Sequence, residues 1–166
     1  MDRNAHLHQL ITILQNACSG EQAAAYAYRG HWKSLDDSRS AERRRIQVIE
    51  EEEWVHRHEA EEMLRSLGAS PAPVKEVRTW FVGRALGLAC HVTGWFLPMY
   101  FAGRLESGNA GEYDDAAYHA AALGYADYER RLGEMAGVER QHELFFRSVI
   151  AGHPWVPRMK RLFGWE

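Results

Sequence analysis

The sequence predicts an all-α protein, an up-down bundle of four core helices with a long crossover between the second and the third. Apolar residues recur at alternating steps of three and four, the spacing of a helix that packs along one face. No apolar run alternates with period two, so we expect no strands. At 166 residues the chain has the length of one domain with a full core.

The first expected helix carries an apolar seam that one glutamate interrupts. Its members are Leu7, Ile11, Leu14, Cys18, Glu21, Ala25 and Tyr28. The segment 34–40, with two aspartates and three serines, is the expected turn to the next helix. A link this short joins antiparallel neighbours.

The second expected helix has the same seam, with a glutamate and a histidine inside it. The seam residues are Ile46, Ile49, Glu53, His56, Ala60, Met63 and Leu67. Gly68, Pro71 and Pro73 follow, and they end this helix because proline cannot donate to the helical ladder and restricts the residue before it.

The stretch from Thr79 to Leu105 carries only two formal charges, on Arg84 and Arg104, and is long enough to cross a bilayer. Its glycines, Pro98 and the arginine near its middle argue against a lipid-facing helix, since a charge at bilayer depth costs about 3 kcal/mol. We interpret the stretch as a buried or interfacial segment that does not span, and its first part as the crossover.

The third and fourth core helices complete the prediction. The third begins near Pro98 and a turn at 123–127 leads to the fourth. Residues 1–152 would form the bundle, and 153–166 a basic, aromatic tail that is irregular or briefly helical. The two seams are Met99, Ala102, Glu106, Asn109, Tyr113 and Ala116, and then Leu132, Met135, Glu139, His142, Phe146 and Val149.

The composition limits the function classes. The net charge is −3 without a basic excess, which argues against a nucleic-acid partner. Cys18 and Cys90 form neither a CxxC pair nor a zinc pattern, so we expect two reduced thiols, with a disulfide as the alternative. The N-terminus lacks the basic start and cleavage site of a secretory signal, so we expect a cytoplasmic protein.

Polar residues occupy seam positions on all four expected core helices. Buried, unpaired carboxylates cost several kcal/mol each, and four that face one another also repel. Two divalent cations would balance the four negative charges. One glutamate on each of two helices, with Glu-x-x-His on each of the other two, is the pattern of di-iron carboxylate proteins. The six candidate ligands are Glu21, Glu53, His56, Glu106, Glu139 and His142.

A single Glu-x-x-His in a charged helix is a weak signal, but two of them on apolar seams, each about 32 residues after a seam glutamate, are a strong one. The ligands also repeat, because Glu21 and Glu106 are 85 residues apart and both other pairs are 86 apart. His58 is expected at the surface and His91 in the core or the crossover. A solvated face is expected for Glu50, Glu51, Glu52, Glu59, Glu61 and Glu62.

The mixture of carboxylate and imidazole favours two iron ions, with manganese or a mixed pair as the alternative. Zinc usually takes four ligands with more nitrogen or sulfur. Neither a flavin nor a nicotinamide fingerprint is present, so electrons would come from an external donor.

At these residues the chain resembles the ferritin-like superfamily, and within it the demethoxyubiquinone hydroxylase family, over roughly residues 7–150. Both Glu-x-x-His elements match. The glycine-containing spacings of the first helix and the crossover also match, at Gly20, Glu21, Ala24, Tyr28 and Gly30 and then at Gly83, Ala85, Leu86, Gly87, Gly94, Met99 and Glu106. The family has a histidine near the third-helix glutamate where this chain has Glu112, so the resemblance implies the metal site more directly than the substrate.

The resemblance implies an oxidoreductase that activates O2 or peroxide and acts on an apolar substrate such as a quinone, at the inner face of a membrane. From their spacing to the glutamates, Tyr28 and Tyr113 would hydrogen-bond beside the ligands or relay an electron, with ordinary core tyrosines as the alternative, and Asn109 and Glu112 are expected next to the site. The 79–105 segment and the tail would form the membrane contact, although core packing or a homodimer interface explains the same residues: Trp155, Phe163, Trp165, Arg158, Lys160 and Arg161. Two alternatives stay open, a rubrerythrin-like peroxidase or ferroxidase and a non-enzymatic helical protein with a structural metal.

Overall fold

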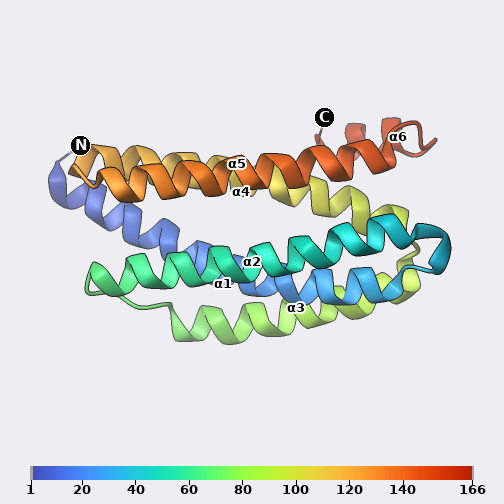
Figure 1. Ribbon diagram of the computed structural model, residues 1–166, viewed down its shortest axis with the longest axis horizontal. Helices are drawn as coiled ribbons and strands as arrows, with labels where there is room; N and C mark the ends of the chain where they lie inside the picture. The colour runs from blue at the N-terminus through green and yellow to red at the C-terminus, as the bar shows by residue number, and fades with distance from the viewer. Residues whose placement is uncertain (1, 166) are drawn as a thin grey trace.

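The computed structural model describes residues 2–165 and confirms an all-α protein, since helices are the only regular elements in that range (Figure 1). The helices are α1 (Arg3–Ser34), the short 3-10 helix η1 (Asp37–Arg39), α2 (Ser40–Ser66), α3 (Pro73–Thr93), α4 (Phe96–Leu123), α5 (Ala126–Ile150) and α6 (Val156–Phe163).

Local sequence signals fix where the helices begin and end. Asp2 caps α1, since its side chain accepts a hydrogen bond from the backbone N–H of Ala5 at 2.8 Å. Pro73 starts α3, where its missing N–H costs nothing. Gly124 ends α4 in the left-handed conformation with φ of 79°, which glycine adopts without strain.

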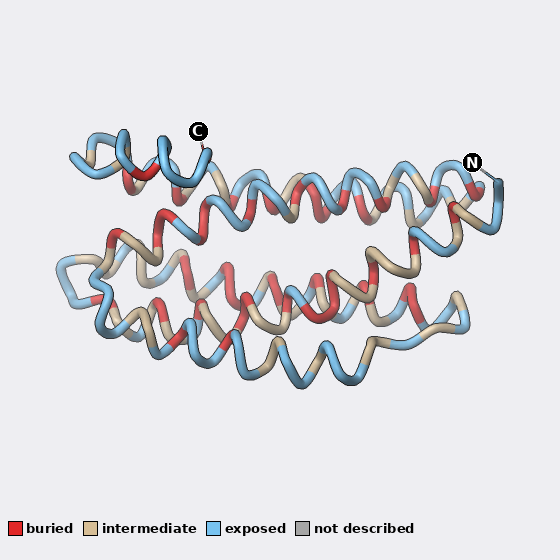
Figure 2. The backbone as a smooth tube through the Cα atoms, turned by 180° about the vertical axis from the view of Figure 1, so that it is seen from behind, coloured by how far each residue is buried: buried red, intermediate tan, exposed pale blue. Residues whose placement is uncertain are grey.

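Two pairs of helices face each other across the molecule. α1 packs against α2 and α4 packs against α5, while α1 also contacts α4 and α2 also contacts α5. In Figure 1 the α1–α2 pair and the α4–α5 pair lie in two layers. Figure 2 shows that the buried residues of both pairs face the space between the layers.

The expected crossover is a complete helix, α3, which lies along α1 and leads from the end of α2 to the start of α4 (Figure 1). Glycines allow this close contact. A Cβ atom on Gly30 would lie 2.3 Å from the Cα of Gly87, and one on Gly83 would lie 2.5 Å from the carbonyl oxygen of Ala23. The glycine spacings in the sequence therefore have a packing role.

The segment was expected to be buried or interfacial, and most of α3 is not buried within this chain. Its buried residues are Gly83 and Gly87, and several large apolar side chains are exposed: Val74, Val77, Phe81, Leu86, Leu88 and Val92. α3 contacts α1 along its glycine face, and this leaves the larger side chains of α3 mostly exposed. Within residues 2–165, we find no helix with the length and apolar character needed to cross a bilayer.

The apolar interior consists of two separate clusters. Cys18, Ala60, Tyr113 and Ala136 belong to one cluster. Ala24, Ile49, Met99 and Phe146 belong to the other. On each of α1, α2, α4 and α5, the predicted glutamate lies in sequence between a member of the first cluster and a member of the second. The candidate ligands therefore occupy the middle of the core.

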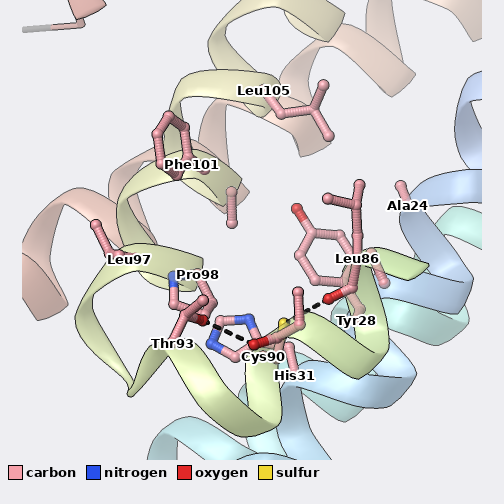
Figure 3. A pocket seen from close by; sticks show the side chains of 13 residues that line it. Ala24, Tyr28, His31, Leu86, Cys90, Thr93, Leu97, Pro98, Phe101 and Leu105 are labelled. Atoms are coloured by element: carbon pink, nitrogen blue, oxygen red, sulfur yellow. Dashed lines mark hydrogen bonds between the residues drawn. The ribbon is translucent and has the colours of Figure 1, made fainter. Parts of the chain in front are cut away.

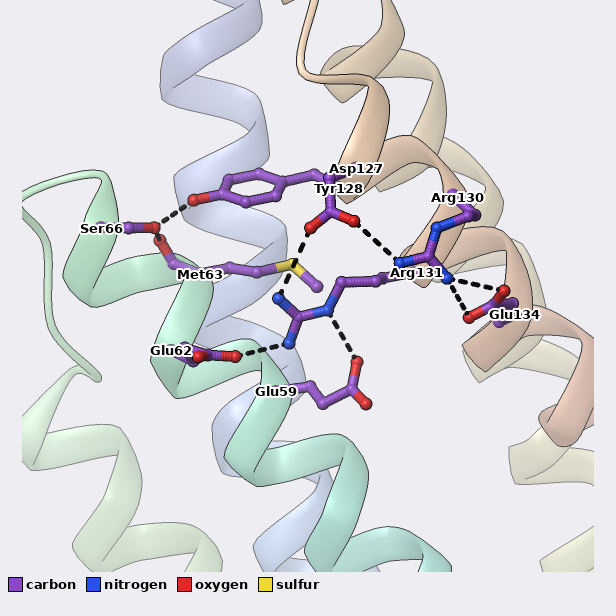
Figure 4. A network of polar contacts seen from close by, with 9 residues as sticks. All are labelled: Glu59, Glu62, Met63, Ser66, Asp127, Tyr128, Arg130, Arg131 and Glu134. Atoms are coloured by element: carbon purple, nitrogen blue, oxygen red, sulfur yellow. Dashed lines mark hydrogen bonds and ion pairs between the residues drawn. The ribbon is translucent and has the colours of Figure 1, made fainter.

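The α2 and α5 helices are also joined near one end by Arg131 of α5 (Figure 4). Its guanidinium lies 3.2 Å from the Oε2 atom of Glu59 and 2.6 Å from the Oε2 atom of Glu62. Both glutamates were expected on a solvated face. Glu62 is exposed, Glu59 is half-buried, and both are partners of this arginine. Exposed ion pairs of this kind contribute at most about 1 kcal/mol each.

The tail contains α6 and folds back onto the helices. Trp165 is only 6% exposed, and its indole N–H donates to the Oε1 atom of Glu143 at 2.9 Å. Its ring fills the space beside Gly103, where a Cβ atom would collide with it. Trp165 is therefore a packing residue and is not available for the expected surface contact, whereas Trp155 and Phe163 are exposed.

Candidate metal centre

The six predicted ligands lie together, deep in the protein. Each is at most 4% exposed. They form two groups, and within each group one candidate ligand atom per residue lies within 4.8 Å of all the others. The first group is Glu21, Glu53, His56 and Glu139, and the second is Glu53, Glu106, Glu139 and His142. Glu53 and Glu139 belong to both groups, so the two groups are adjacent and share two carboxylates, and each group could hold a metal ion.

Helix geometry explains how the shared glutamates meet the histidines. Residues three apart lie on the same face of a helix, so Glu53 and His56 project together from α2, and Glu139 and His142 from α5. Across the interface, the Nδ1 atom of His56 lies 2.7 Å from the Oε1 atom of Glu139. The Nδ1 atom of His142 lies 3.3 Å from the Oε1 atom of Glu53.

Many polar atoms of this cluster form no hydrogen bond of normal geometry, and these include the Nδ1 atom of His56 and the Oε1 atom of Glu139, although the two lie only 2.7 Å apart. Buried polar atoms are nearly always paired, and each unpaired one costs about 1–3 kcal/mol. The unpaired atoms here are Oε2 of Glu21, both carboxylate oxygens of Glu53, Nδ1 of His56, Oε2 of Glu106, Oε1 of Glu139 and Nδ1 of His142. All six residues contribute at least one. These oxygen and imidazole donors fit divalent transition-metal ions, which would complete their coordination.

The charges of the cluster lead to the same conclusion. Burial raises the pKa of Glu53 and of Glu106 well above the usual value, and nearby carboxylates raise both further. Burial also raises the pKa of Glu21. Burial raises the pKa of Glu139, but the proximity of Glu106 and His56 lowers it by more, so the pKa of this residue is lowered overall. Burial therefore favours the protonated forms of Glu21, Glu53 and Glu106 unless a positive charge lies among them.

Two tyrosines connect α1 and α4 through these carboxylates. The hydroxyl of Tyr28 donates to the Oε1 atom of Glu106, and the hydroxyl of Tyr113 donates to the Oε1 atom of Glu21. Each tyrosine lies seven residues after the glutamate of its own helix and binds the glutamate of the other helix. The two halves of the site are therefore related by a reciprocal exchange of hydrogen bonds.

Asn109 and Glu112 were also expected near the ligands. The side-chain amide of Asn109 donates to the Oε2 atom of Glu139 at 3.5 Å, so this residue touches the site. Glu112 is exposed at the surface of α4. The structure therefore brings Asn109 to the cluster and leaves Glu112 at the surface.

Sequence reasoning missed one residue of the site. Glu52 was expected on the solvated face, but its Oε2 atom lies 2.8 Å from the Nε2 atom of His142 and 2.9 Å from Arg45. A carboxylate on the far nitrogen of a histidine fixes the ring and leaves its other nitrogen for a metal. The available signal was the position of Glu52 directly before the ligand Glu53.

Glu50 was also placed wrongly. It is 7% exposed and accepts hydrogen bonds from Arg29 and from the indole of Trp32, both at 2.7 Å. This pair holds α2 to α1, and burial of the carboxylate follows from those two donors. His58 is exposed as expected, and His91 lies exposed on the crossover helix α3.

Comparison of the chain with protein-family models, with curated proteins and with solved structures finds no match.

Proposed function

We propose that this chain is a di-iron oxidoreductase that activates O2 or peroxide, similar to monooxygenases of the demethoxyubiquinone hydroxylase type. One observation carries the proposal. Six buried carboxylate and imidazole residues form two groups that share Glu53 and Glu139, and each residue has an unpaired donor atom. The resemblance in the ligand spacings and in the glycines of α1 and α3 supports the same family.

The proposed fold is a ferritin-like four-helix bundle of α1, α2, α4 and α5, with α3 as the crossover. The contacts of α1 with α2 and α4, and of α5 with α4 and α2, support this interpretation. In such bundles the ligands project inward from all four helices.

The residues of the chain have separate tasks in this proposal. Glu53 and Glu139 would hold both ions, because each belongs to both groups. Glu21 and His56 would hold one ion, and Glu106 and His142 the other. Iron pairs bound in this way supply the electrons for reducing O2 or peroxide, and an external donor returns them. Tyr28 and Tyr113 hold the terminal carboxylates in place, and Glu52 orients His142.

An apolar cavity favours an organic substrate. It lies between α1, α3 and α4 (Figure 3), and Tyr28, which binds Glu106, forms part of its wall. A small peroxide substrate, as in a rubrerythrin-like peroxidase, is the second candidate. A polar cavity lined by Arg104, Asn109 and Glu112 favours it, since Asn109 also contacts Glu139.

We also propose a peripheral membrane contact through the exposed apolar side chains of α3, which include Val77, Phe81 and Leu88. Co-sedimentation with liposomes tests this contact. The expected result is binding that Phe81→Glu and Leu88→Glu together abolish. A chain that stays in the supernatant and elutes as a dimer would instead assign this face to a second copy.

The test of the proposed activity is oxygen consumption. Protein loaded with Fe²⁺ without oxygen should consume O2 when exposed to it, and Glu139→Ala should consume far less. Turnover of peroxide without consumption of an organic substrate would favour the second candidate. Iron-loaded protein that leaves both O2 and peroxide untouched would contradict the proposed activity and leave a structural metal as the function.

A further inference from the structure

Two histidines meet where the beginning of α1 packs against the end of α4. The Nδ1 atom of His6 on α1 lies 2.9 Å from the Nδ1 atom of His119 on α4. His6 is only 8% exposed, whereas His119 is partly exposed. The pair therefore lies at the edge of the core and is open to solvent on the side of His119.

This pair is separate from the candidate metal centre. His6 precedes Glu21 by 15 residues on α1, and His119 follows Glu106 by 13 residues on α4. A helix rises about 1.5 Å per residue, so each histidine lies about 20 Å along its helix from the candidate ligand. The pair has no part in the chemistry proposed for the centre.

An aromatic neighbour holds both rings in place. The ring centroid of Tyr118 lies 5.8 Å from that of His6 and 5.3 Å from that of His119, and the two imidazole centroids are 5.1 Å apart. The three rings form one packed group at the junction of α1 and α4. Ligands that are held by packing before an ion arrives make a better metal site than mobile ones.

The charges around the pair suit a cation. Burial and the proximity of His6 lower the pKa of His119, although Asp115 raises it in part. A neutral imidazole has a lone pair on one nitrogen and a proton on the other, and this is the form that binds metals. Asp115 lies one helical turn before His119, so its negative charge would offset part of the charge of a bound ion.

The distance between the two nitrogen atoms indicates the kind of ion. Bonds from divalent transition metals to imidazole nitrogen are about 2.0–2.1 Å long, so nitrogens 2.9 Å apart make an angle of about 90° at the ion. This is the angle between adjacent ligands in tetragonal coordination, which is typical of Cu²⁺ and Ni²⁺. Tetrahedral zinc would separate the two nitrogens by about 3.3 Å. The pair therefore favours copper or nickel over zinc.

We propose that His6 and His119 form a separate metal site, which binds one Cu²⁺ or Ni²⁺ ion through their Nδ1 atoms, with water at the remaining positions. The ion replaces the hydrogen that the two rings share, and it lies beside the line that joins the nitrogen atoms. The ring that donates in the pair then carries its proton on Nε2, so no proton is lost overall. The bound ion joins the beginning of α1 to the end of α4.

A titration of the full chain with Cu²⁺ locates the site by NMR. Cu²⁺ is paramagnetic and broadens the signals of nearby residues, and it is added up to an excess over the two ions of the proposed centre. The amide signals next to His6 and His119 should broaden as a group of their own, distinct from those next to Glu53 and Glu139. Signals next to the pair that stay sharp throughout would overturn the proposal. This measurement uses the wild type, so it does not depend on a variant that folds.

His119→Gln separates metal binding from packing. Glutamine can still form a hydrogen bond with His6, but its amide is a poor ligand for these ions. The affinity of the pair for Cu²⁺, read from the same titration, should fall at least about 10- to 100-fold, because even the loss of a residue that only orients a ligand has that effect. An unchanged affinity would overturn the role of His119.

His8→Gln is the matched control, because His8 lies two residues after His6 on α1 and is exposed. It should bind Cu²⁺ at the pair as the wild type does, and a loss as large as that of His119→Gln would assign the binding to a general effect of surface histidines.

The iron content of the same variants separates this site from the candidate centre. His119→Gln should take up as much Fe²⁺ as the wild type, and a loss of iron in this variant would contradict the separation of the two sites. If the wild type takes up no iron but shows the broadening next to His6 and His119, the proposed oxidoreductase fails and this site stands.

Discussion

The Nε2 atom of His142 on α5 lies 2.8 Å from the Oε2 atom of Glu52 on α2, so the opposite nitrogen of the ring is directed toward Glu53. Such a contact positions a metal-binding histidine. We predict that Glu52→Gln weakens metal binding about 10- to 100-fold, the usual effect of losing such a partner. The measurement is a competitive titration with a chelator.

Glu51 provides the control, because it is the adjacent glutamate and is exposed. Glu51→Gln should bind metal as the wild type does. Equal losses in the two variants would mean that a general change in charge, and not the contact with His142, is responsible.

The hydrogen bond from Tyr113 to Glu21 joins α4 to α1 inside the core. Tyr113→Phe removes the donor and leaves a buried carboxyl oxygen unpaired. We predict a loss of about 1–3 kcal/mol in the free energy of unfolding of the metal-free protein. Urea denaturation measures it, with Tyr118→Phe as the control because Tyr118 is 63% exposed. Similar midpoints for the two variants would contradict this role.

The raised pKa values of three buried carboxyls should make the metal-free protein less stable as the pH rises, whereas His31, whose pKa burial lowers to about 4, contributes in the opposite direction below pH 6.5. Burial raises the pKa values of Glu21, Glu53 and Glu106 in the folded state above their value of 4.5 in the unfolded chain. The folded state then binds more protons than the unfolded state, and the free energy of unfolding decreases with pH. This contribution is fully present below pH 4.5 and is lost as the pH rises through the raised pKa values.

Thermal melts between pH 6.5 and pH 8 test this dependence, because the opposing contribution of His31 lies below pH 6.5. The melting temperature of the metal-free protein should decline, and the increase caused by added metal should be larger at pH 8, because ions replace the protons. The double variant Glu53→Gln, Glu106→Gln should show a flatter decline. The assignment would be contradicted if the melting temperatures of the metal-free wild type and of the double variant both rose with pH by the same amount.

The close contact of α1 with α3 predicts unequal effects at two glycines of α1. A Cβ atom on Gly30 would meet the backbone of Gly87 at 2.3 Å, so Gly30→Ala should destabilise the protein by about 1–3 kcal/mol. No atom lies within 4 Å of a Cβ on Gly20, so Gly20→Ala should be neutral or stabilising by up to about 1 kcal/mol. Denaturant unfolding of both variants compares them, and a reversed order would contradict the packing.

The six candidate ligands could be predicted because each occupies a seam position, and the period of the helix assigns such a position to the interior. Glu52 and Glu50 could not be predicted in this way. Their positions are off the seam, and they are held by His142 and Arg29, whose proximity depends on how whole helices pack.

The surroundings of the site could not be predicted from the sequence either, because they depend on tertiary packing. The exposure of α3 follows from contact through Gly83 and Gly87, which the apolar composition of the segment does not indicate. Trp165 is buried because Gly103 leaves room for its ring, although the two residues lie 62 positions apart.

The central claim is that the buried carboxylates and imidazoles hold two cations, and an anaerobic titration of the metal-free protein with Fe²⁺ tests it most directly. We predict two iron ions per chain with a higher melting temperature, about one in His142→Ala, and fewer still in Glu53→Ala, because Glu53 belongs to both groups. A wild-type protein that stays folded and takes up no iron, or variants with unchanged stoichiometry, would contradict the account.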